Sequence, residues 1–103
     1  MNISKIINGL RYDTATATEI CSFESSVSQA DFQYEETWLY KTPRGQFFLA
    51  GRGGAMTRWA QPVQDGRSGG RGLVPVGVEE ARAFAEDHAG EEIVAQFFEI
   101  EEA

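Results

Sequence analysis

A β-hairpin that decides the fold is predicted by the stretch Thr37-Trp38-Leu39-Tyr40-Lys41-Thr42-Pro43-Arg44-Gly45-Gln46-Phe47-Phe48-Leu49-Ala50. Aromatic and branched side chains on both sides of the turn are typical of strands. Pro43 presets φ for a turn, and Gly45 relieves strain where the chain reverses. Alternate residues of a strand share a face, so Trp38 and Tyr40 are expected on the same side. We expect this hairpin to form the centre of the core.

A second hairpin is predicted near the start of the chain. Its turn is Asn8-Gly9, a pair that suits a two-residue type I′ turn because both positions need positive φ. In that register Ile7 faces Leu10 across the turn. The alternating stretch 18–23 is rich in strand-forming residues and predicts a third strand.

The second half of the chain predicts helices. Residues 78–89 place apolar side chains on one stripe of a helix, which begins after Gly77 and stops at Gly90. Residues 91–98 predict a second, shorter helix. Between the hairpins and the helices, we expect a flexible loop rich in glycine and arginine at about 61–72. Residues 73–76 are expected to form a short strand at most, because Pro75 cannot donate to a ladder.

The order of these elements predicts an α+β fold. We expect an antiparallel β-sheet of four to six strands built from two hairpins. One main C-terminal amphipathic helix and a second short helix should pack on this sheet. The side chains expected to be mostly buried are Trp38, Phe47, Leu49, Phe84, Ile93 and Phe97.

Composition describes a small acidic globular protein. The chain has 103 residues, and 16 acidic against 9 basic side chains give a net charge of −7. This length supports a single domain spanning residues 1–103. No apolar run approaches the roughly 18 residues of a membrane span, so no membrane partner is expected. The lone cysteine, Cys21, suits a reducing cytoplasm, where thiols stay free.

The charge is distributed unevenly along the chain. Residues 41–72 carry +5, whereas residues 79–103 carry −8 and the first 40 residues carry −4. Such asymmetry indicates charged partners. The alternative is that the acidic segments only solvate the domain and pair with its own arginines.

Few side chains are available for catalysis. The one histidine, His88, falls on the apolar side of the predicted helix. A general base needs a positioned partner, so we expect His88 to be a packed or boundary residue rather than a catalytic one. Cys21 lies in a predicted strand, where a thiol acts as a small buried hydrophobe. One cysteine and one histidine cannot form a zinc cluster. We therefore expect no enzyme activity, no catalytic residue, no metal and no cofactor.

Two glycine-rich segments raise the question of phosphate or nucleic-acid binding. The run 51–54 lacks the Lys-Ser or Lys-Thr that completes a phosphate-binding loop. Residues 66–72 read Gly-Arg-Ser-Gly-Gly-Arg-Gly, similar to RGG-type segments that contact nucleic acid. The alternative is a flexible surface loop, since the net negative charge opposes nucleic-acid binding at long range.

Several motifs spread over nearly the whole chain carry a family resemblance. They are Lys5-Ile6-Ile7-Asn8-Gly9, Tyr12-Asp13-Thr14, Thr16-Ala17-Thr18-Glu19-Ile20, Leu39 to Leu49, Gly53-Gly54-Ala55-Met56-Thr57-Arg58-Trp59-Ala60 and Pro75-Val76-Gly77-Val78-Glu79-Glu80-Ala81. Together they resemble a family of small proteins carried by phages, plasmids and other mobile elements, which includes a type II-A anti-CRISPR protein. The motifs describe turns and core, so they transfer no site residue. Gly77 departs from the serine or threonine helix cap expected in the family.

The resemblance implies a non-enzymatic anti-CRISPR protein in the cytoplasm of a bacterial host. It would bind a type II Cas nuclease in its guide-RNA complex stoichiometrically and block target DNA binding or cleavage. Such nucleases hold nucleic acid in basic channels, which an acidic protein can occupy as a DNA mimic. The expected partner-binding residues are Glu79, Glu80, Glu86, Asp87, Glu91 and Glu92.

A second surface and two other functions remain open. The alternative partner-binding residues are basic and would grip guide RNA or an acidic protein: Arg52, Arg58, Arg67 and Arg71. The alternative functions are a nucleic-acid-binding protein and a mobile-element accessory protein that binds another host factor. Direct binding of nucleic acid is less favoured than binding of the nuclease, because the whole chain is acidic.

Overall fold

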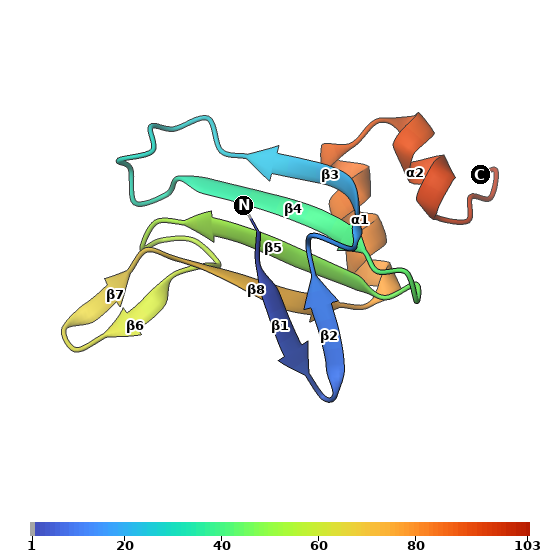
Figure 1. Cartoon of the computed structure of the whole chain (residues 1–103). Coiled ribbons are helices and arrows are strands. Elements are labelled where there is room, and N and C mark those ends of the chain that lie inside the picture. Colours follow the sequence, from blue (N-terminus) through green and yellow to red (C-terminus); the bar gives the residue numbers. More distant parts are fainter. Residues whose placement is uncertain (1) are drawn as a thin grey trace.

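Eight strands and two helices make up the computed structural model, which describes residues 2–103 (Figure 1). The elements follow one another in the order β1 (Ser4–Ile7), β2 (Leu10–Asp13), β3 (Thr18–Glu24), β4 (Glu35–Lys41), β5 (Phe47–Gly53), β6 (Gln61–Val63), β7 (Gly66–Ser68), β8 (Gly70–Val76), α1 (Val78–His88) and α2 (Glu91–Phe97). The predicted α+β class with an antiparallel sheet is therefore confirmed.

The main sheet has four strands in the order β3-β4-β5-β8, and all neighbours are antiparallel. The hairpin predicted at 37–50 forms its two central strands, with Leu39 opposite Leu49 and Lys41 opposite Phe47. Gly45 closes the turn with φ of 87°, a left-handed conformation that glycine adopts without strain. Phe47 to Ala50 are all buried, which follows from the covering of both sheet faces.

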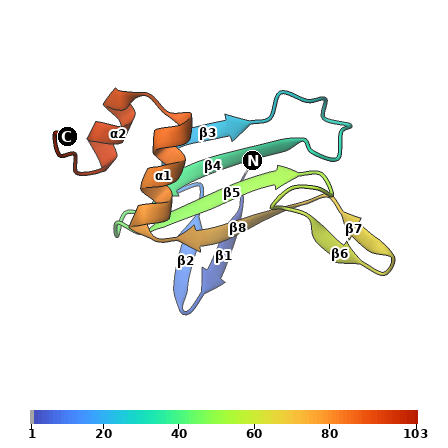
Figure 2. The same cartoon turned by 180° about the vertical axis from the view of Figure 1, so that it is seen from behind.

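The two faces of the main sheet are covered by different elements. Helix α1 crosses one face and contacts β3, β4 and β5, as Figure 2 shows. The core on this helix face contains Ile20, Leu39, Phe47, Leu49, Trp59, Ala81, Phe84, Ala85, Val94 and Phe98. On the opposite face, which we call the hairpin face, residues of β2 pack against the sheet in a core made of Tyr12, Tyr40, Phe48, Ala50 and Leu73.

The first hairpin has the predicted turn and register. Ile7 lies opposite Leu10, and Asn8 and Gly9 have φ of 53° and 79°. The hairpin does not extend the main sheet, however. Strands β1 and β2 form a separate two-stranded sheet, which buries Tyr12 edge-on against Phe48 at a centroid distance of 5.7 Å.

The segment between β5 and β8 differs from its prediction. Residues 61–72, expected to be a flexible loop, form the β6–β7 hairpin and the start of β8. The strand expected at 73–76 is longer, because β8 begins at Gly70 and pairs along its whole length with β5. Pro75 is tolerated there because β8 is an edge strand and its missing N–H disturbs no second ladder.

The loop before β6 completes the core on the helix face. Trp59 is 5% exposed, and its indole lies over two glycines of the sheet, Gly51 and Gly72. A Cβ atom on Gly72 would lie 3.1 Å from Cε3 of Trp59, so the glycine makes room for the ring. The indole N–H donates a hydrogen bond of 2.9 Å to Oγ1 of Thr37, which is fully buried.

Both helices begin at glycines and end near their predicted positions. Gly77 and Gly90 are the residues before α1 and α2, and neither offers a side-chain cap. The burial predicted for Phe47, Leu49 and Phe84 is confirmed. Three other predicted core residues are only partly buried, because they lie at the rims of the two cores: Trp38, Ile93 and Phe97. Within residues 2–103, neither helix is long and apolar enough to cross a membrane.

Candidate functional site

The acidic residues predicted to bind a partner form one exposed surface on the two helices. Glu79, Glu80, Glu86 and Asp87 recur at a seven-residue spacing, which keeps them on the side of α1 opposite its buried residues. The first turn of α2 adds Glu91 and Glu92, both exposed. We call these six residues the acidic surface.

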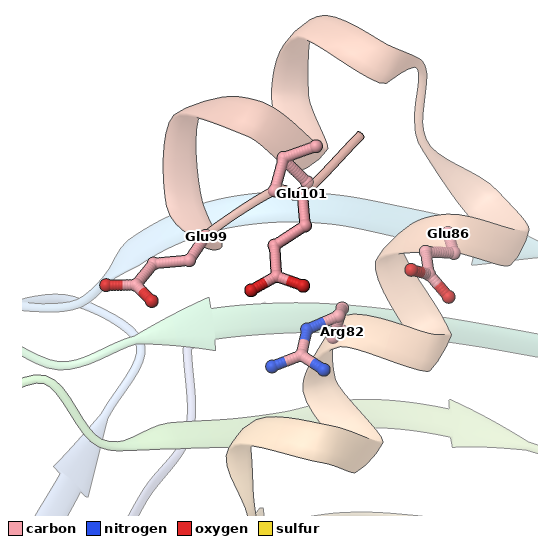
Figure 3. Close-up of a pocket in the computed structure, with 5 residues that line it drawn as sticks. Arg82, Glu86, Glu99 and Glu101 are labelled. Carbon is pink, nitrogen blue, oxygen red and sulfur yellow. The ribbon is translucent and has the colours of Figure 1, made fainter. Parts of the chain in front are cut away.

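The acidic surface borders a pocket that the C-terminal segment helps to form. This pocket, of about 420 Å³, is lined by Arg82, Glu86, Glu99, Ile100 and Glu101. Figure 3 shows that the chain returns toward α1 after α2 and brings the carboxylates of Glu99 and Glu101 to the side of the pocket where Arg82 lies. Glu86 also lines a neighbouring pocket with Glu91, so the pocket is continuous with the acidic surface.

The balance of charge in this pocket favours a cationic group. Three carboxylates face one guanidinium there, so the lining residues carry a net charge of −2. The Nε atom of Arg82 is buried and has no hydrogen-bond partner among the described residues. A lysine or arginine side chain of a basic partner fits this arrangement by charge.

Glu99 and Glu101 were not among the predicted binding residues. The sequence shows them as part of an acidic C-terminal run, but they lie beyond the last helix. Their place beside Glu86 depends on the path of the chain after α2. The sequence shows that Glu99 and Glu101 are acidic, but it does not show which residues lie next to them in space.

The four arginines of the alternative surface are separated by the fold. Arg58 pairs with Glu35 at 3.2 Å and lies 5.9 Å from the ring centre of Phe84, on the helix face. Arg52 pairs with Glu36 at 2.8 Å and lies beside Arg71 on the hairpin face. Arg67 is exposed on the β6–β7 hairpin. The four side chains therefore do not form one basic surface.

Glu36 is the best-partnered carboxylate on the hairpin face. The hydroxyl of Tyr34 donates a hydrogen bond to Oε1 of Glu36, and Nη2 of Arg52 donates another. These bonds, led by that of Tyr34, lower the pKa of Glu36. The same hydrogen bond raises the pKa of Tyr34, because its phenol is needed as the donor.

Neither of the two side chains considered for catalysis is part of the acidic surface. His88 is exposed, and its ring lies 4.6 Å from that of Phe84 and 4.7 Å from that of Phe23. Burial, with the nearby charge of Glu19, raises the pKa of Cys21 to about 11, so its thiol stays protonated at neutral pH. Among residues 2–103, no cluster of three histidine, cysteine or acidic side chains is arranged to hold a metal ion.

The chain matches no protein-family model, no curated protein and no solved structure. The candidate site therefore stands on its own geometry. It combines an exposed acidic helical surface, a charged pocket at its border and a separate pair of arginines on the opposite face of the sheet.

Proposed function

We propose that the protein is a non-enzymatic inhibitor that binds a type II RNA-guided Cas nuclease stoichiometrically. In this proposal it acts in the bacterial cytoplasm and blocks target DNA binding or cleavage. The support comes from the family resemblance of the turn and core motifs, and from the acidic surface that the fold exposes. These nucleases grip nucleic acid with basic channels, which offer a partner of complementary charge.

One observation carries the proposed mode of binding. All six carboxylates of the acidic surface are exposed, and none forms an ion pair with another described residue. The ion pairs of the described chain instead join two carboxylates of β4 to arginines, Glu36 to Arg52 of β5 and Glu35 to Arg58 of the loop before β6. The acidic surface is therefore available to basic side chains of another molecule. Complementary charge of this kind mainly raises the association rate and specificity.

The test is a cleavage assay with purified nuclease, guide RNA and target DNA, titrated with this protein. A variant with Glu79→Lys, Glu80→Lys and Asp87→Lys should lose inhibition. Its fold should persist, because exposed charges contribute little to stability. The matched control reverses three exposed acids that lie outside the helices and changes the net charge equally: Glu19→Lys, Glu24→Lys and Asp65→Lys.

The control variant should inhibit like the parent protein. Equal inhibition by both triple variants would reject the acidic surface as the binding site. No inhibition by the parent protein at a stoichiometric excess would reject the proposed function for the nuclease tested. Binding should also weaken as salt is added, because the Debye length is about 8 Å at physiological ionic strength.

The accessory-protein alternative makes a different prediction in a pull-down experiment. An inhibitor should retain the purified nuclease, with or without its guide RNA. A protein that binds another host factor should not retain the nuclease in either form.

Replacing Arg67 and Arg71 by alanine tests the alternative basic residues without leaving Glu35 or Glu36 unpaired.

A further inference from the structure

A row of four charged side chains crosses the hairpin face of the main sheet. The register places Glu24 opposite Glu36, Glu36 opposite Arg52, and Arg52 opposite Arg71. The row is therefore negative at the β3 edge and positive at the β8 edge. Like charges directly opposite each other destabilise a sheet. Glu36 neutralises Arg52, whereas Arg71 has no ion pair within residues 2–103.

Trp38 lies next to this row on the same face. Its direct neighbours across the strands are small, Ser22 in β3 and Ala50 in β5. No large side chain in the sheet therefore covers the indole from either side, and Trp38 stays partly exposed at the rim of the core under the first hairpin. Arg52 is its diagonal neighbour, a position within reach of a long side chain.

These residues line one pocket. It measures about 390 Å³ and is formed by Glu36, Trp38, Arg52 and Arg71. The guanidinium of Arg52, whose side chain is 53% exposed, forms an ion pair with the carboxylate of Glu36. The pocket thus combines a partly exposed aromatic ring, one arginine paired with Glu36 and one arginine without an ion pair.

We propose that this pocket binds single-stranded nucleic acid, with one unpaired base stacked on Trp38 and the adjoining phosphates contacted by Arg52 and Arg71. Aromatic rings beside positive charge are the general means of binding single strands, because every base has a face that can stack. A duplex does not fit this arrangement, since its bases are already stacked on one another. The proposal does not rest on the proposed nuclease inhibition.

The acidic character of the protein does not prevent this binding at physiological salt. The acidic surface lies on the two helices, of which α1 crosses the opposite face of the sheet and α2 lies beyond one end of β3 (Figure 2). Interactions between exposed charges fall off over a Debye length of about 8 Å. Glu24 and Glu36 lie closer to the pocket than the acidic surface does. Their negative charge restricts the nucleic acid to the β5–β8 side of the pocket.

The first experiment measures the anisotropy of a fluorescein-labelled, 12-nucleotide single strand titrated with the protein alone. The parent protein should bind the single strand more tightly than a duplex of the same sequence. Arg71→Ala should weaken binding about tenfold, a loss typical of one charge-assisted contact. The matched control, Arg44→Ala, removes another exposed arginine, which lies outside the pocket, and should leave binding unchanged.

The second experiment reads stacking directly from tryptophan fluorescence. Addition of the unlabelled single strand should quench the emission of the parent protein. In Trp38→Phe, which keeps an aromatic ring for packing, the quenching should disappear because the remaining Trp59 is buried. No detectable binding by the parent, equal loss in Arg71→Ala and Arg44→Ala, tighter binding of the duplex, or quenching that persists in Trp38→Phe would each overturn the proposal. Equal competition by an acidic peptide would also overturn it, because a peptide has no base to stack.

Discussion

Thr37 and Trp59 illustrate how one buried polar contact holds two distant parts of the chain together. Thr37 lies in a central strand and is fully buried, and Trp59 lies in the loop before β6. Oγ1 of Thr37 accepts the indole N–H of Trp59 at 2.9 Å and donates its own proton to Glu35 at 2.6 Å. The hydroxyl thus satisfies a donor that water cannot reach.

Replacing Thr37 by valine tests this contact. Valine has nearly the same shape and lacks the hydroxyl, so the indole N–H of Trp59 would be buried without an acceptor. The free energy of unfolding should fall by about 1–3 kcal/mol, measured by urea denaturation. The control, Thr37→Ser, keeps the hydroxyl, so its free energy of unfolding should fall by less than that of the valine variant. A valine variant as stable as the serine variant would show that the hydrogen bond contributes nothing.

The turn of the first hairpin requires a particular backbone conformation at both of its residues. Both turn residues have positive φ, 53° at Asn8 and 79° at Gly9, and the hairpin they close covers the hairpin face. A Cβ atom on Gly9 would meet no other atom within 4 Å. Any cost of a side chain there therefore comes from the backbone conformation alone.

Gly9→Val should accordingly destabilise the protein by at least about 1 kcal/mol, because a β-branched residue resists positive φ. Gly9→Asn is the matched control, since asparagine tolerates this conformation, as Asn8 already does. Thermal unfolding of both variants measures the difference. If the valine and asparagine variants melt at the same temperature, the turn does not constrain the hairpin.

The whole molecule is a thin sheet with additions on both faces and at one end. Its radius of gyration is 14.6 Å, larger than the roughly 13 Å of a compact domain of this size. Figure 1 shows the reason, because the β1–β2 and β6–β7 hairpins project beyond the main sheet. Every residue from 61 to 69 is exposed, so the second of these hairpins lacks a core of its own.

Hydrogen exchange should therefore differ between the centre and this arm. An isolated two-stranded hairpin is at best marginally stable, and exposed segments open without global unfolding. The amides of residues 61–68 should exchange much faster than those of Leu39 and Leu49, which lie between paired strands. Exchange followed by NMR measures both rates. Equal protection would show that the arm is stabilised as strongly as the core.

Much of the fold was predictable from the sequence, because its signals are local. The turn at Asn8-Gly9, the central hairpin and the two helices depend on residues only a few positions apart. The exposure of Glu79 and Glu86 on α1 follows in the same way from the helical period. The β6–β7 hairpin was not predicted, because its segment is rich in glycine and arginine and has no pattern of strand-forming residues that would indicate the pairing.

The sequence by itself determined most of the elements, the acidic surface and the α+β class, since each follows from local spacing and composition. Only the tertiary structure decided that the first hairpin covers one face of the sheet and that Trp59 packs into the core on the other face. It also brought Glu101 back to α1, beside Arg82. It also separated Arg58 from Arg52 and placed Trp38 beside the latter. These arrangements join residues far apart in the chain, and they depend on which apolar surfaces can be buried together, a property that no local pattern records.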